Sequence, residues 1–189
     1  MKHTLVALVE DRPGVLNRIV SLFSRRAFNI ESLTVGHTDQ PNLSRMTLVV
    51  DGTDHDVEQV VKQLYKVIDV LKVSDVTNEK TIMRELALIK IAATRESRSE
   101  IMQIVDIYRA KIVDVASDSV VAEITGPEEK IDSFVGLVRP FGIKELVRTG
   151  RVAMVRSAVG VTRTQSDDTE TPAQVRAKAL ARSAAMAAD

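Results

Sequence analysis

The residues best placed to do chemistry lie near the N-terminus, in the string Val-Glu-Asp-Arg-Pro-Gly-Val-Leu at positions 9–16. An apolar run, Thr4–Val9, ends there at two acidic residues, and a helical pattern begins just beyond the glycine. A strand that turns this tightly into a helix leaves backbone N–H groups without intrahelical partners, beside the positive end of the helix dipole. This junction therefore predicts an anion-binding site.

The glycine pattern narrows the kind of anion. Gly14 stands alone in this turn, so the sequence has neither the phosphate-loop spacing nor the dinucleotide-binding spacing of glycines. A small carboxylate is therefore a better hypothesis for the ligand than a nucleotide.

The helix that follows the turn has one wide apolar face. Asp11 is a plausible N-cap, and Pro13 suits the first helical turn, where its missing N–H donor costs nothing. Arg25-Arg26 falls in the last turn, where cations complement the helix dipole. The apolar residues recur at a spacing near 3.6, and they are Val15, Leu16, Ile19, Val20, Leu22 and Phe23.

The rest of the N-terminal half predicts three more strands and one more helix. The strands are expected at residues 28–37, 44–50 and 70–76. Gly52-Thr53-Asp54 caps the helix, whose apolar residues are Val57, Val60, Val61, Leu64 and Ile68. The order βαββαβ folds as a split sheet with both helices on one face, and right-handed crossovers place the first and third strands in its centre.

The C-terminal half repeats this order without repeating the chemistry. Its strands and helices are expected, in chain order, at residues 85–92, 97–109, 111–116, 120–125, 126–138 and 143–149. The first strand-to-helix turn, Thr94-Arg95-Glu96-Ser97, holds neither glycine nor proline. The predicted fold class is therefore α+β, with two ferredoxin-like βαββαβ units at residues 1–77 and 78–157.

Residues 158–189 differ in character from both units. Residues 165–172 are polar and acidic, as in a disordered connector, and residues 172–188 are rich in alanine. A helix of this length with so little apolar face is marginal in water. We therefore expect a disordered or frayed tail rather than a docked helix.

The composition is that of an ordinary globular protein, and it excludes several functions. Hydrophobic residues make up 44% and charged residues 28%, with 26 basic and 26 acidic residues and no cysteine. Zero net charge argues against a general binder of nucleic acid or acidic membranes, and disulfides and thiolate metal sites are impossible. His3, His37 and His55 lack any metal-ligand spacing, and His37 is interpreted as polar surface. No stretch is typical of a secretory signal or a membrane span, so a cytoplasmic location is expected.

The turn at positions 9–16 and its surroundings resemble the ACT domains of amino-acid sensors. Three further strings narrow the resemblance: Leu22-Phe23-Ser24-Arg25-Arg26, Phe28-Asn29-Ile30-Glu31-Ser32-Leu33-Thr34-Val35 and Leu43-Ser44-Arg45-Met46-Thr47. They look like the regulatory (small) subunit of acetohydroxyacid synthase, also called acetolactate synthase. The string Arg84-Glu85-Leu86-Ala87-Leu88-Ile89-Lys90 resembles the start of that family's C-terminal domain. The resemblance covers residues 2–156.

This resemblance implies a valine site shared by two ACT domains of a homodimer or higher oligomer. The ligand residues it implies are Asp11, Gly14, Val15, Leu16, Asn29 and Ile30. The first four belong to one chain, where backbone N–H groups would hold the carboxylate of valine and Asp11 would accept from its ammonium. The last two belong to the neighbouring chain, and Asn29 would offer its amide oxygen. Many relatives have Asn in place of Asp11, a change that bears on which branched-chain amino acid is preferred.

The resemblance also implies a partner that does the catalysis. That catalytic (large) subunit condenses pyruvate with a second 2-oxo acid, and thiamine diphosphate, Mg²⁺ and FAD are expected on it rather than on this chain. The small subunit would raise its activity and transmit feedback inhibition by valine. This chain itself shows no nucleophile–base pair and no metal cluster, so no catalytic residue is assigned.

Two other classes of function are compatible with the sequence. A stand-alone amino-acid sensor or regulator could use the same turn, although no helix-turn-helix or basic recognition helix is evident. A split-βαβ RNA-binding domain would want exposed aromatic residues on its central strands, and the aromatic residues here lie mostly elsewhere. Judged alone, residues 11–14 could be only a capped helix start, and Asn29 only a turn residue. The sequence does not say whether leucine or isoleucine also binds.

Overall fold

The structure, a computed structural model, describes residues 1–156 of the 189-residue chain, which divide into two compact units. Unit 1 is Met1–Ile82 together with the described residues from Ala153 onward, and unit 2 is Met83–Val152. The predicted tail, residues 158–189, lies outside the described residues. Within residues 1–156, the helices are too short or too polar to span a lipid bilayer.

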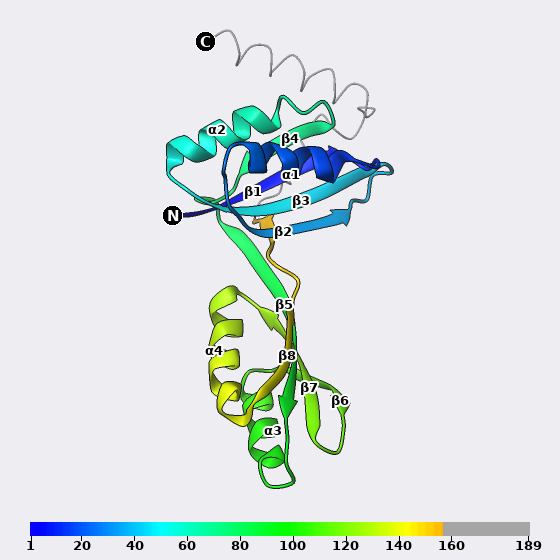
Figure 1. Ribbon diagram of the computed structural model, residues 1–189, viewed down its shortest axis with the longest axis vertical. Coiled ribbons are helices and arrows are strands. Elements are labelled where there is room, and N and C mark those ends of the chain that lie inside the picture. The colour runs from blue at the N-terminus through cyan, green and yellow to red at the C-terminus, as the bar shows by residue number, and fades with distance from the viewer. Residues whose placement is uncertain (157–189) are drawn as a thin grey trace. The chain divides into compact units, whose positions relative to one another are not determined.

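Unit 1 is a four-stranded antiparallel sheet with two helices. Its elements are β1 (Lys2–Glu10), α1 (Val15–Arg25), β2 (Ile30–His37), β3 (Leu43–Asp51), α2 (Asp54–Leu64) and β4 (Val70–Asp75). The strand order is β2-β3-β1-β4, with β1 and β3 in the centre (Figure 1). This order confirms the predicted split βαββαβ sheet, and it leaves β2 as an edge strand of the sheet.

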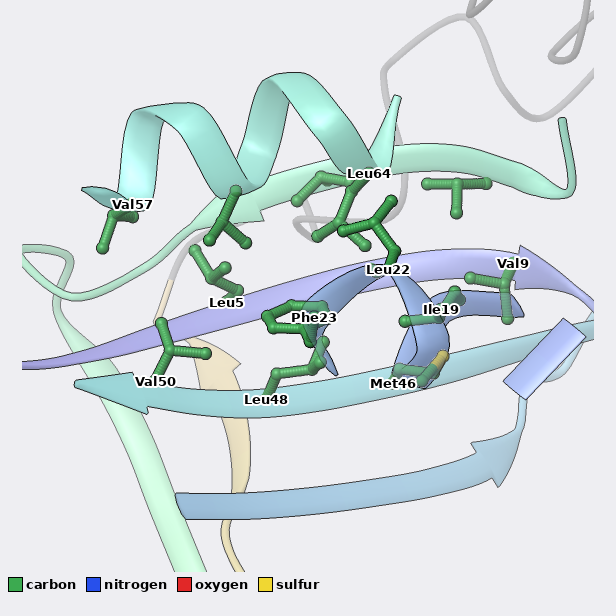
Figure 2. Close-up of a cluster of buried hydrophobic side chains, with 14 of the residues drawn as sticks. Leu5, Val9, Ile19, Leu22, Phe23, Met46, Leu48, Val50, Val57 and Leu64 are labelled. Atoms are coloured by element: carbon green, nitrogen blue, oxygen red, sulfur yellow. The ribbon is translucent and has the colours of Figure 1, made fainter. Parts of the chain in front are cut away.

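One face of this sheet is buried under both helices. Because successive side chains of a strand point to opposite faces, alternate residues of β1 and β3 reach the same core. Figure 2 shows that core, formed by Leu5, Val9, Met46, Leu48 and Val50 from the strands and by Ile19, Leu22, Phe23, Val57 and Leu64 from the helices. Full burial of each large apolar side chain contributes about 1.5–3 kcal/mol. This core fixes α1 on the sheet, and with it the turn that precedes α1.

The start of α1 corrects two sequence predictions. The N-cap is Gly14, in the left-handed conformation with φ 89°, and the helix begins at Val15. Asp11 is therefore not the N-cap, and Pro13 lies before the helix rather than in its first turn. The backbone N–H of Asp11 donates to the carbonyl oxygen of Asn42 at 2.7 Å, and its carboxylate contacts Nδ1 of His37 at 3.0 Å instead of a helix N–H.

The second helix begins where predicted and ends earlier. Thr53 is the N-cap of α2 in a capping box with Asp56, whose carboxylate accepts from the Thr53 N–H at 2.8 Å. The helix ends at Leu64, so placing Ile68 on its apolar face was wrong, and Ile68 is half exposed. The Tyr65 hydroxyl donates to the Val73 carbonyl and accepts from the Val73 N–H, so the chain is tied to β4 directly after the helix.

Unit 2 has the same order of elements and its own core. Its elements are β5 (Thr81–Ala92), α3 (Arg98–Ile107), β6 (Lys111–Val115), β7 (Ser119–Gly126), α4 (Glu128–Val138), the 3₁₀ turn η1 (Arg139–Phe141) and β8 (Ile143–Arg148). The last strand, β9 (Val152–Val155), follows, and its residues from Ala153 onward belong to unit 1. The sheet order is β6-β7-β5-β8, and β9 also pairs with β5. Ile89, Ile101, Ile131 and Phe134 lie at the centre of the core. Unit 2 thus repeats the architecture of unit 1, as predicted.

Candidate functional site

The turn between β1 and α1 has a firmly anchored base. The Glu10 N–H donates to the carbonyl oxygen of Asp69 at 2.8 Å, and the Asp11 N–H donates to that of Asn42 at 2.7 Å. These two acceptors precede β4 and β3, the strands that flank β1 in the sheet. The turn is therefore held from both sides, as a preformed binding site requires.

Gly14 gives the turn its shape and leaves the space beside it open. Its φ of 89° is a conformation that side-chain-bearing residues rarely adopt. Within residues 1–156, a Cβ placed at Gly14 would meet no atom within 4 Å other than those of its chain neighbours. The backbone alone therefore explains the glycine, and a ligand can approach the main chain closely here.

The N-terminal end of α1 presents backbone N–H donors and lacks an acidic side chain that would compensate them. Val15 N–H donates to the Arg12 carbonyl at 3.3 Å, whereas the Gly14 and Leu16 N–H groups find no backbone acceptor within residues 1–156. The first turn of α1 carries no acidic side chain, so the helix does not compensate the positive end of its own dipole. Three backbone N–H groups were predicted to donate to the ligand carboxylate, and those of Gly14 and Leu16 are available for it.

Asp11 lies beside these donors, and its carboxylate is already in contact with a histidine. Its Oδ2 lies 3.0 Å from Nδ1 of His37, and the two side chains are 44% and 85% exposed. The contact arises from the strand register, because His37 pairs with Ser44 and Ser44 pairs with Val9. The predicted β2–β3 hairpin was the signal that could have placed His37 here, but its residue-by-residue register could not be read from the sequence.

Asn29 and Ile30 lie far from the turn within one chain. Ile30 pairs with Val50, which pairs with His3 at the opposite end of the sheet from residues 11–16. The separation is close to the length of β2, about 23 Å for seven steps of about 3.3 Å. One copy of unit 1 therefore brings Asp11, Gly14, Val15 and Leu16 together and keeps Asn29 and Ile30 apart from them.

Exposed apolar side chains occur on α1 and on the edge strand β2 of unit 1. Leu16 and Val20 of α1 are 45% and 38% exposed, and Val35 of the edge strand β2 is 48% exposed. Edge strands present unpaired N–H and C=O groups that another chain can pair with. Both elements thus carry features that suit contact with a second protein chain.

Elsewhere on unit 1 there is an open hollow of about 540 Å³ that includes none of the predicted ligand residues. It is lined by Asn17, Arg18, Ser21, Arg25, Lys66, Val67 and Ile68. Within residues 1–156 no group of three or more His, Asp and Glu side chains could hold a metal ion. Residues 11–16 thus offer two backbone N–H donors that could meet an anion and one carboxylate that could meet a cation.

A split βαββαβ unit of this kind, with an anion-ready turn between β1 and α1, is an ACT domain. The family model described as "AHAS small subunit-like ACT domain" matches residues 5–72, and the model described as "small subunit of acetolactate synthase" matches residues 84–157. The two matches together cover both units.

Whole-chain relatives agree with these matches. A probable acetolactate synthase small subunit from Archaeoglobus fulgidus is 57% identical over 156 residues, which cover 82% of this chain and 98% of that protein. The acetolactate synthase small subunit of Bacillus subtilis is 50% identical over 158 residues, covering 82% of this chain and 91% of that protein. The crystal structure of the acetolactate synthase small subunit from Thermotoga maritima superposes with a TM-score of 0.78 at 41% identity, covering 84% of this chain and 99% of that one. This chain belongs to the acetolactate synthase small-subunit family.

Proposed function

We propose that this chain is the regulatory subunit of an acetolactate synthase, which raises the activity of the catalytic subunit and transmits feedback inhibition by valine. Membership of the small-subunit family implies a large catalytic partner. The cofactors of the reaction, expected from the resemblance to be thiamine diphosphate, Mg²⁺ and FAD, would belong to that partner. The observation that carries the valine part of the proposal is the turn at residues 11–16.

The chemistry of the turn fits a free amino acid. The N–H groups of Gly14 and Leu16 would donate to the ligand carboxylate, favoured by the helix dipole. The Asp11 carboxylate would accept from the ligand ammonium, and a carboxylate has acceptor capacity beyond the one contact it makes to His37. The exposed side chain of Leu16 offers an apolar contact for the valine side chain.

The strand register supports a site completed by a second copy of this chain. If two β2 edges pair antiparallel about a two-fold axis between Leu33 and Thr34, Ile30 of the second copy lies opposite His37 of the first. Asn29 of that copy then lies opposite Thr38, one residue beyond His37, whose imidazole contacts Asp11. Within one chain, β2 separates residues 11–16 from residues 29–30. Between two chains paired in this way, the two groups come together at each end of the paired strands. A dimer of this form has two equivalent valine sites.

Inhibition would then be an allosteric coupling between valine, bound between two copies of unit 1, and the catalytic subunit, bound elsewhere on the chain. Valine would hold two copies of unit 1 in one relative orientation, and the catalytic subunit would respond to that orientation. By linkage, the catalytic subunit in its inhibited form must favour valine binding by the same free energy, typically about 1–3 kcal/mol.

The variant Asn29→His tests this proposal. It should weaken inhibition of the catalytic subunit by valine and leave activation intact, because Asn29 is exposed and outside the core. Asn78→His, at another exposed asparagine outside the predicted site, is the matched control and should change neither quantity. Loss of activation with Asn29→His would make Asn29 structural. A wild-type chain that binds valine without affecting the catalytic subunit would instead be a stand-alone sensor.

A further inference from the structure

The contact between Asp11 and His37 adds a titratable group to the proposed site. Nδ1 of His37 lies 3.0 Å from the carboxylate that would receive the ammonium of the ligand. Histidine is the side chain whose charge ordinarily changes between about pH 5 and pH 8. The charge that valine meets at Asp11 therefore depends on whether the imidazole carries an extra proton.

The surrounding ionisable groups are held in contacts of their own. Arg12 lies 3.1 Å from the Glu10 carboxylate, and Arg45 of β3 donates to the Ala153 carbonyl at 2.6 Å. Burial lowers the pKa of the Arg45 guanidinium. The ordinary pKa of this group is so high that it nevertheless stays charged. Asp39 lies in the turn that follows β2, and Arg18 of α1 is paired with Asp69.

We propose that His37 is a further residue of the amino-acid site, where its added proton competes with the ligand ammonium for the Asp11 carboxylate. This inference rests on the proposed valine site. A neutral imidazole donates one hydrogen bond and leaves the negative charge of Asp11 available to the ligand. A protonated imidazole cancels that charge and also repels the ammonium. Valine binding therefore favours the neutral imidazole and releases a proton from the protonated form.

The dimer register places His37 inside the shared site rather than at its margin. Antiparallel pairing about the midpoint of β2 sets His37 opposite Ile30 of a second copy, next to Asn29 of that copy. The imidazole would then be covered by the partner strand, and its charge would be less screened by water than in one copy alone. Inhibition by valine should accordingly weaken as the pH falls.

Calorimetric titration of the full chain with valine at pH 5.5 and pH 7.5 tests this proposal. Surface ion pairs of this kind change affinity by about two- to five-fold, so the dissociation constant should be two- to five-fold higher at pH 5.5. At pH 6.5, the measured heat should also differ between buffers of different ionisation enthalpy, because a proton is released.

The variant His37→Asn separates the proton from the hydrogen bond. Its amide nitrogen can replace the donor at Nδ1 but cannot gain a proton, so affinity should become independent of pH. His55→Asn, at an exposed histidine on α2, is the matched control and should keep the wild-type dependence. Equal affinities of the wild type at both pH values, or a pH dependence retained in His37→Asn, would overturn the role of His37 and leave the valine site standing. A wild type that binds no valine at either pH would overturn the site itself.

Discussion

The role assigned to Gly14 can be tested with two substitutions that differ only in charge. Gly14→Asp and Gly14→Asn introduce side chains of nearly equal size, and both residue types tolerate a positive φ better than most. Within residues 1–156, a Cβ at this position meets nothing within 4 Å beyond its chain neighbours, so the first atom of either side chain has room. Both should therefore lose a similar, small amount of stability to the φ of 89°.

The two variants should differ sharply in valine binding. The carboxylate of Gly14→Asp would lie beside the carboxylate of the ligand, and two like charges about 4 Å apart repel by about 1 kcal/mol in water and about 4 kcal/mol at an effective dielectric constant of about 20. Gly14→Asp should accordingly bind valine about 5- to 1,000-fold more weakly than Gly14→Asn. Titration calorimetry measures this ratio directly. If both variants bind valine equally well, the ligand carboxylate does not lie at this helix terminus.

Three further perturbations test the edge strand, the helix cap and the core. Val35→Lys on the exposed edge of β2 should shift the chain from dimer to monomer in sedimentation experiments without unfolding it, because charged side chains block edge pairing. Asp56→Asn should lower the thermal midpoint at pH 7, and this effect should fade as the pH is lowered into the acid range. The Thr53 N–H and hydroxyl lower the pKa of the Asp56 carboxyl, so its stabilising contribution is present above the ordinary value and is lost as the pH falls through the lowered one. Phe23→Ala should cost about 3–5 kcal/mol in denaturant unfolding, since Phe23 is fully buried and its ring packs edge-on against Phe28.

The pattern of apolar residues in the sequence was sufficient to predict the order of strands and helices in both units. The nearly continuous apolar runs of β1 and β3 indicate central, buried strands, and the 3.6-residue spacing in α1 determines which face of that helix is buried. Short connections then leave few possible topologies. Helix ends were less predictable, because they depend on contacts with distant residues. Asp11 has the chemistry of an N-cap, yet its carboxylate contacts His37 and the turn extends to Gly14 before the helix begins. Likewise α2 stops before Ile68 because Tyr65 bonds to β4.

The site was predictable only in the part that is local in sequence. Residues 11–16 are adjacent along the chain, so the sequence alone is enough to group their donors and acceptor. The contact from His37 depends on the register of two strand pairs, and a shift of one residue would turn its side chain to the other face of the sheet. The separation of Asn29 from the turn likewise follows from the register.

The central claim is that this chain controls a catalytic partner through valine at the turn. The most direct measurement is the rate of acetolactate formation by the catalytic subunit alone, with this chain, and with this chain plus valine. The chain should raise the rate and valine should lower it again, while Gly14→Asp should raise the rate without permitting inhibition. A rate that the chain does not change, or valine inhibition that persists with Gly14→Asp, would contradict the account.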